Sequence, residues 1–212
     1  MNLELISVHF PKAAGSSLAS ALKAHFGDAL ALDYHHDPVN PDHPLSERPA
    51  LTEGARAVHG HFRWDRYIEH RGAFRLTFLR EPVANLVSIY SYWRSLPSQG
   101  SATHDRFLAE QPTILDFARS YWPLRRLMSV TYFGGMDIGS FDFVGFYETR
   151  VRDLERLSKQ LGLSLSSDIY VNQTAPMPER QLLMQDSATV STLRSLLRDD
   201  VAFFEKARER WD

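Results

Sequence analysis

The sequence contains no cysteine among its 212 residues. Without a thiol group the chain has no disulfide, no iron–sulfur cluster, no cysteine nucleophile and no cysteine-ligated zinc site. We therefore expect a reducing, cytoplasmic location. Long apolar runs are also missing, since none approaches the roughly 20 residues that span a bilayer. The first 25 residues lack the pattern of a secretory signal peptide, so we expect no membrane anchor.

Neither sign of charge prevails, because 24 basic residues stand against 26 acidic ones and give a net charge of -2. This balance excludes a basic coat for nucleic acid, and we expect no nucleic-acid partner. It leaves room for a small basic pocket that binds an anion. The composition is that of an ordinary globular protein, with 43% apolar residues and 24% charged residues. The length and the lack of internal repeats predict a single domain, residues 1–212.

Short apolar segments alternate with segments of helical period. Strands are predicted over 3–10, 55–59, 74–79, 141–147 and 169–172. The helices predicted between and after them include one capped by Ser16 or Ser17, one beginning at Pro82, one ended or kinked by Pro123, one closed by Gly162, a short one over 64–70, and two pieces over 187–210. Loops are predicted over 33–49 and 96–103. This alternation predicts an α/β fold, a three-layer sandwich around a central, mainly parallel sheet.

The segment Pro-Lys-Ala-Ala-Gly-Ser-Ser, residues 11–17, connects the first strand to the first helix. Its small residues allow backbone N–H groups to surround an anion, and the helix N-terminus adds partial positive charge. Lys12 adds a full charge. The segment differs from a Walker A motif because its lysine precedes its only glycine, Gly15. An ordinary turn with a chance lysine is the alternative.

Arg80 follows the strand over 74–79, and Ser88 comes eight residues later on the next helix. Helical side chains lean toward the N-terminus, so Ser88 can point back toward Arg80. A guanidinium and a hydroxyl group at one site suit a phosphate. The alternative is a superficial ion pair between Arg80 and Glu81, with Ser88 in solvent.

The triplet His59-Gly60-His61 follows another strand. A histidine with a pKa near neutrality can take a proton from an alcohol. The alternative is one packed and one exposed histidine. Ligands bind beyond the carboxyl ends of parallel strands, and all three motifs are placed there. The sequence therefore predicts one cleft that they share.

Together these segments resemble the sulfotransferases that use 3′-phosphoadenosine 5′-phosphosulfate (PAPS), particularly the carbohydrate branch. Residues 8–18 resemble the 5′-phosphosulfate loop of that family, and residues 77–90 its 3′-phosphate motif. Residues 58–62 are similar to the segment that supplies the base in heparan sulfate 2-O-sulfotransferases. Residues 143–148 resemble a further family segment. The likeness spans roughly residues 5 to 160.

The resemblance implies a P-loop-like sulfotransferase fold and transfer of a sulfuryl group from PAPS to a hydroxyl-bearing acceptor, a carbohydrate or small metabolite. It also implies roles for residues at three places, without a metal. Lys12 would stabilise the leaving phosphate, His59 would be the base with His61 as the fallback, Arg80 and Ser88 would hold the 3′-phosphate, and Ala13, Ala14, Gly15, Ser16 and Ser17 would hold the 5′-phosphosulfate.

Two departures from the family pattern bear on these roles. Ala13 and Ala14 stand where many members have Thr-Gly, and no segment matches the Arg-Lys-Gly motif of the cytosolic branch. Three other functions stay open: a non-catalytic protein that binds the product 3′-phosphoadenosine 5′-phosphate (PAP) or a related nucleotide, a nucleotide kinase, and a structural α/β domain. The histidines and aspartates over 34–43 are interpreted as a solvated loop rather than as metal ligands. The oligomeric state is not predicted.

Overall fold

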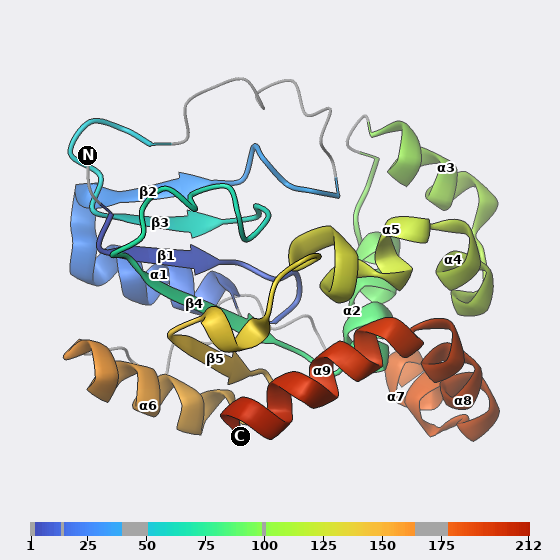
Figure 1. Ribbon diagram of the computed structural model, residues 1–212. Coiled ribbons are helices and arrows are strands. Elements are labelled where there is room, and N and C mark those ends of the chain that lie inside the picture. The colour runs from blue at the N-terminus through green and yellow to red at the C-terminus, as the bar shows by residue number, and fades with distance from the viewer. Residues whose placement is uncertain (1–2, 14, 40–50, 99–100, 164–177) are drawn as a thin grey trace.

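The fold is built on one parallel β-sheet (Figure 1). The computed structural model describes residues 3–13, 15–39, 51–98, 101–163 and 178–212. Five strands pair in the order β2-β3-β1-β4-β5, and every pairing is parallel. The predicted α/β fold with a central parallel sheet is therefore confirmed. The strands are β1 (Leu5–Val8), β2 (Leu30–Asp33), β3 (Ala57–Gly60), β4 (Phe74–Leu79) and β5 (Phe143–Phe146).

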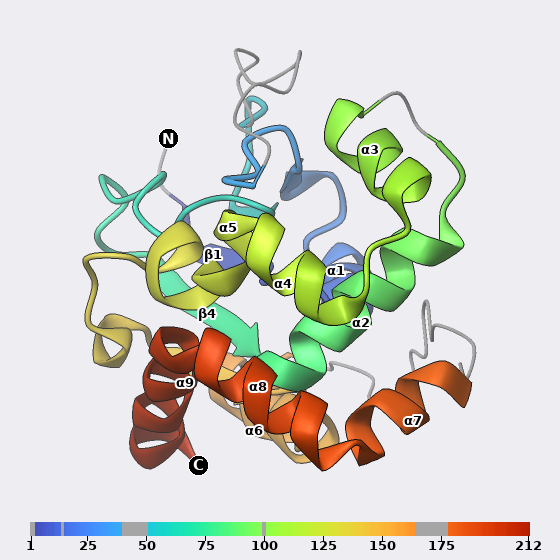
Figure 2. The same ribbon diagram turned by 90° about the vertical axis from the view of Figure 1, so that its right-hand side faces the viewer.

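Helices cover both faces of this sheet and its carboxyl end. Helix α1 (Gly15–Phe26) lies behind the sheet in Figure 1, whereas α9 (Arg198–Trp211) crosses in front of it. A larger group of helices lies beyond the carboxyl ends of the strands (Figure 2). The other described helices are α2 (Pro82–Ser95), α3 (Ala102–Glu110), α4 (Ile114–Ser120), α5 (Trp122–Arg125), a π-helix (Leu127–Tyr132), α6 (Arg150–Leu161), α7 (Pro178–Gln185), α8 (Ser187–Leu196) and two short 3-10 helices (Gly27–Ala29 and Ile138–Ser140). In the described part of the chain, no helix is both long enough and apolar enough to cross a bilayer.

The register of the three strands β2, β3 and β1 explains why their following residues meet. Ser7 pairs with His59, and Val8 pairs with Gly60, which in turn pairs with Asp33. The residues that follow these strands therefore leave the sheet at one level. Because side chains alternate between the two faces of a strand, positions two residues apart point the same way.

Several local signals determine where helices begin and end. The Glu81 carboxylate caps α2 by accepting from the Ala84 amide at 2.7 Å, and Pro82 occupies the first turn as predicted. Gly162 closes α6 with a φ of 65°, a left-handed conformation that favours glycine. Residues 187–210 form α8 and α9, the two predicted pieces.

Other sequence-based expectations were wrong or incomplete. Residues 64–70 form turns rather than a helix, and α1 begins at Gly15, so Ser17 lies inside its first turn instead of capping it. Strand β2 was missed because Leu-Ala-Leu-Asp is four residues long and has no β-branched side chain. Helices α3 and α7 were not predicted. The strand expected over 169–172 lies outside the described residues.

Candidate functional site

The loop after β1 is held in place by two side chains, one from the residue that follows β4 and one from α2. Asn85 donates from Nδ2 to the Pro11 carbonyl at 2.7 Å, and Arg80 donates from a guanidinium N–H to the Lys12 carbonyl at 3.0 Å. The backbone of Lys12 has a φ of 58°, in the left-handed region that residues other than glycine rarely adopt. Such local strain persists only where the surroundings impose it, and it is common at binding sites.

Three cationic side chains come together around this loop. Lys12 Nζ lies 4.1 Å from the ring centre of Tyr92, and Lys12 forms no ion pair with any residue in the described ranges. Burial lowers the pKa of Lys12, as do the charges of Arg80 and Arg180. Burial also lowers the pKa of Arg80 to about 10, and the Arg180 charge contributes again. Arg180, on α7, is thus close enough to add positive potential at the loop.

Arg80 is almost entirely buried, with 3% of its surface exposed. Its guanidinium carbon lies 4.0 Å from the ring centre of Tyr147, and its Nε has no hydrogen-bond partner within the described residues. A buried N–H without a partner is costly. Arg80 therefore keeps unused capacity to donate to an anion in addition to holding the loop.

Three imidazole rings stack at the carboxyl ends of β1 and β3. The ring of His9 lies between the others, 5.0 Å from His59 and 4.2 Å from His61, with interplanar angles of 22° and 20°. The Tyr34 ring meets all three edge-on, and its hydroxyl is 3.2 Å from His9 Nδ1. The strand register produces this stack, because His9 and His61 follow Ser7 and His59 by two residues each.

The stack also touches the loop. A Cβ atom on Gly15 would lie 1.9 Å from the His9 ring, so only glycine fits at the first position of α1. The histidine rings and the loop therefore lie against each other at the carboxyl end of the sheet.

Burial keeps these imidazoles neutral. It lowers the pKa of His59 to about 3, and the charge of His61 adds to the effect. It holds the pKa of His9 well below its ordinary value of 6.5, and it also lowers the pKa of His61. In His61 the Asp37 carboxylate and the His9 carbonyl oppose the shift. Of the three shifts, the one at His61 is the one that a carboxylate opposes.

His59 and His61 differ in access. His59 has no exposed surface, its Nδ1 is 2.8 Å from the Ser7 hydroxyl, and a hydrogen bond to the Gly15 backbone partly opposes the lowering of its pKa. His61 is partly exposed, and its Nδ1 is 2.8 Å from the His9 carbonyl. A carbonyl oxygen only accepts hydrogen bonds, so neutral His61 carries its hydrogen on Nδ1 and a lone pair on Nε2.

The segment after β2 forms an internal network of hydrogen bonds. The buried Asp33 carboxylate accepts from His36 at 2.6 Å, from Arg66 at 3.0 Å and from Tyr67 at 2.7 Å. No group of three or more His, Asp or Glu side chains in the described ranges could hold a metal ion. Asp42 and His43 lie outside those ranges.

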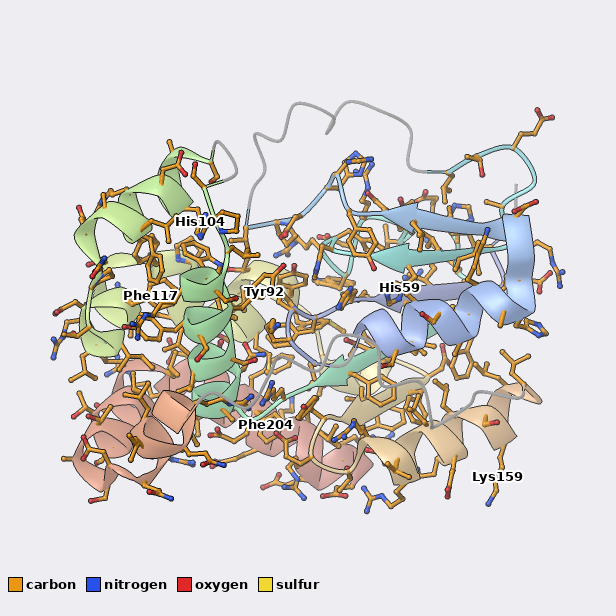
Figure 3. The ribbon with its side chains drawn as sticks, turned by 180° about the vertical axis from the view of Figure 1, so that it is seen from behind. His59, Tyr92, His104, Phe117, Lys159 and Phe204 are labelled. Carbon is orange, nitrogen blue, oxygen red and sulfur yellow. The ribbon has the colours of Figure 1, made fainter. Side chains whose placement is uncertain are left out.

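The predicted site residues are placed as follows. Lys12, Gly15, His59, His61 and Arg80 come together at the carboxyl end of the sheet, where Figure 3 labels His59 beside the strands and Tyr92 on α2. Ala13 is buried in the loop, and Ser17 is partly exposed in the first turn of α1. Ser88 lies on α2, 3% exposed. Ala14 and the Ser16 side chain lie outside what the structure describes.

Sequence reasoning missed four contributors, His9, Tyr34, Tyr132 and Arg180. For His9 a signal existed, since it stands two residues after Ser7 just as His61 stands two after His59. Arg180 is 100 positions from Arg80 in sequence and has no motif around it. Only the folded chain brings its charge to the loop.

Comparison with known proteins gives no match at the sequence level. No protein-family model matches the sequence, and the search of curated proteins likewise returns no match. Among solved structures, mouse sulfotransferase SULT7A1 complexed with PAP is 17% identical, with a TM-score of 0.39, and the match covers 92% of this chain and 64% of the mouse chain. A sulfotransferase from Alicyclobacillus acidocaldarius is 17% identical, with a TM-score of 0.44, over 97% of this chain and 99% of the bacterial one. Likenesses of this size assign neither a family nor an activity to the chain.

Proposed function

We propose that this chain transfers a sulfuryl group from PAPS to a hydroxyl group of a carbohydrate or another small metabolite. The observation that carries the proposal is the loop after β1, where Lys12, Arg80 and Arg180 raise the positive potential beside the N-terminus of α1. Such a site suits a ligand with several phosphate or sulfate groups. The resemblance of residues 8–18 and 77–90 to PAPS-binding segments supports the same ligand.

The proposed reaction is a single in-line displacement. The acceptor oxygen bonds to sulfur as the bond between sulfur and the 5′-phosphate oxygen breaks, and the hydroxyl proton passes to a histidine. Positioning and charge stabilisation dominate chemistry of this kind. The Lys12 ammonium would neutralise the charge that develops on the leaving phosphate. The backbone of residues 13–17 would hold the 5′-phosphosulfate, and Arg80, Ser88 and Arg180 would hold the 3′-phosphate.

We assign the role of base to His61 in preference to His59. His59 has no exposed surface, and burial lowers its pKa to about 3. His61 is partly exposed and presents a free lone pair on Nε2 if its hydrogen stays on Nδ1. His59 would instead support the stack through its hydrogen bond with Ser7.

One observation favours a second function, the non-catalytic binding of PAP or a related nucleotide. The histidine that best matches the family segment, His59, is enclosed and out of reach of an acceptor. A binding protein would keep the cation cluster and have no need of an accessible base. The two functions differ in one result, since only the enzyme sulfates a hydroxyl group when supplied with PAPS.

Binding is tested by thermal unfolding in the presence of PAP, 5′-AMP or Mg-ATP. A ligand at 100 times its Kd stabilises a protein by about 2.7 kcal/mol, which is about 5 to 10 °C for a chain of this size. We expect that shift with PAP and little with 5′-AMP, because 5′-AMP lacks the 3′-phosphate. A shift with Mg-ATP alone would point to a kinase, and no shift with any ligand would contradict the proposal.

A matched pair of variants ties the binding to the loop. Lys12→Met keeps an unbranched side chain of nearly the same length and removes the charge, so it should reduce the PAP shift. Lys159→Met removes an exposed lysine on α6, remote from the loop in Figure 3, and should leave the shift unchanged. Equal effects of the two variants would mean that PAP binds elsewhere.

A further inference from the structure

The hydroxyl group of Tyr132 lies between His61 and Asp37. Its oxygen is 3.2 Å from His61 Nδ1 and 3.0 Å from Asp37 Oδ1. Tyr132 is completely buried and ends the π-helix Leu127–Tyr132. Helices of this kind occur often at functional sites. None of the roles proposed above uses Tyr132 or Asp37.

The acceptors in this series of three hydrogen-bonded side chains determine where their hydrogens lie. A carboxylate only accepts, so Tyr132 donates its O–H to Asp37. The Tyr132 oxygen is then free to accept from the Nδ1–H of His61, which it shares with the His9 carbonyl. The hydrogen bonds thus lead from the imidazole N–H of His61 through the hydroxyl group of Tyr132 to the Asp37 carboxylate.

We infer that Tyr132 and Asp37 are positioning residues that make His61, of the three stacked histidines, the one that accepts the proton of the acceptor hydroxyl. This inference rests on the proposed function. As the acceptor oxygen bonds to sulfur, its proton goes to His61 Nε2. The Nδ1–H of the resulting imidazolium then donates to oxygen atoms backed by the Asp37 carboxylate. Among the described residues, neither His9 nor His59 has a hydrogen-bond partner that itself donates to a carboxylate.

The groups around the stack support this selection. Tyr34 and Asp37 face it from the segment after β2, Lys12 from the loop after β1, and Tyr132 from the π-helix. Lys12 disfavours a positive charge on His9, and Asp37 favours one on His61. A positive charge on one imidazole ring disfavours a second charge in the stack. The single Asp37 carboxylate is therefore sufficient to determine that His61 is the ring that takes up the proton.

The π-helix holds Tyr132 firmly. The buried Asp200 carboxylate accepts from the Met128 and Ser129 amides at 2.9 and 2.7 Å, and Trp64 donates its amide to the Tyr132 carbonyl at 3.1 Å. The Tyr132 ring packs edge-on against Phe10, with 5.4 Å between ring centres. Its hydroxyl is therefore fixed in place before any ligand binds, as a positioning residue requires.

The test is a pH titration of the histidine ring nitrogens by NMR in the free protein labelled with 15N-histidine. It compares the wild type with Tyr132→Phe and Asp37→Asn. Both variants should lower the proton affinity of His61. Asp37→Asn should do so by about tenfold, because it removes a nearby charge, and Tyr132→Phe should do so because it removes the hydroxyl that links His61 to that charge. The matched control is Tyr67→Phe, which removes another buried hydroxyl that donates to an aspartate, Asp33, at 2.7 Å. It should leave the His61 titration unchanged.

An unchanged His61 titration in both Tyr132→Phe and Asp37→Asn would overturn the inference, as would a wild-type His61 with its hydrogen on Nε2. If Tyr132→Phe fails to fold, Asp37→Asn alone decides, because Asp37 lies in a partly exposed loop. The titration needs neither PAPS nor an acceptor. Failure of PAP to bind would therefore refute the proposed function independently of this result.

Discussion

Lowering the pH from about 7.5 to about 5 is expected to destabilise the fold through the stacked imidazoles. Burial lowers the pKa of His59 from 6.5 to about 3, so the unfolded chain binds a proton that the folded chain does not. Stability is complete above pH 6.5 and falls as the pH drops below it. At pH 5 the loss from His59 alone is about 2 kcal/mol, or about 4 to 8 °C in Tm.

Urea unfolding at a series of pH values measures this loss. Carboxylates titrate mostly below this range, so histidines dominate between pH 5 and 6.5. His59→Asn, which keeps a hydrogen-bonding group near Ser7 and cannot take a proton in this range, should flatten the dependence. His25→Asn, at an exposed position on α1, is the control. Equal free energies of unfolding at pH 5 and 7.5 in the wild type would refute the reasoning.

Three further predictions concern the loop and its cations. Lys12→Met should reduce turnover, measured by kinetics, by about 10² to 10³-fold, and should reduce PAP affinity, measured by calorimetry, by much less. Equal losses of turnover and affinity would mean that Lys12 binds the nucleotide without a role in catalysis. Gly15→Ala should destabilise the fold by about 1 to 3 kcal/mol in urea unfolding, because its methyl group would overlap the His9 ring, whereas Gly72→Ala, with no atom within 4 Å of the new Cβ, should have little effect. Arg180→Ala should weaken PAP binding by about tenfold in calorimetry, and Arg198→Ala, 84% exposed, should not; identical affinities in the two variants would remove Arg180 from the site.

The sequence predicted those parts of the fold whose signal is local. Strand β4 follows its predicted limits because six mostly apolar residues end at Arg80-Glu81-Pro82, which begins the next helix. Gly162 predicted the end of α6 because a left-handed residue is needed there. Strand β2 has no such signal, and it is a strand because its backbone pairs with β3.

The site was predictable to the same extent. Lys12, Arg80, His59 and His61 stand in motifs beside strand ends, so their meeting followed from the parallel sheet. The difference in access between His59 and His61 did not follow, because both rings contact His9 and Tyr34 and only the folded chain shows which of the two has exposed surface. Tyr132 and Arg180 reach the site from helices that are distant in sequence, and no local sequence pattern predicts tertiary contacts of that kind.

If the proposed ligand binds as described, the hydrogen bonds from Asn85 and Arg80 to the Pro11 and Lys12 carbonyls would connect its two subsites thermodynamically. Any ligand group that binds Arg80 and Ser88 also changes the free energy of holding the loop in its left-handed conformation at Lys12. By linkage, an anion in the loop changes the affinity at Arg80 and Ser88 by the same factor. The binding free energy of a bisphosphate that spans both subsites would then differ from the sum of the binding free energies of its two halves. The difference would measure the coupling that Asn85 and Arg80 carry.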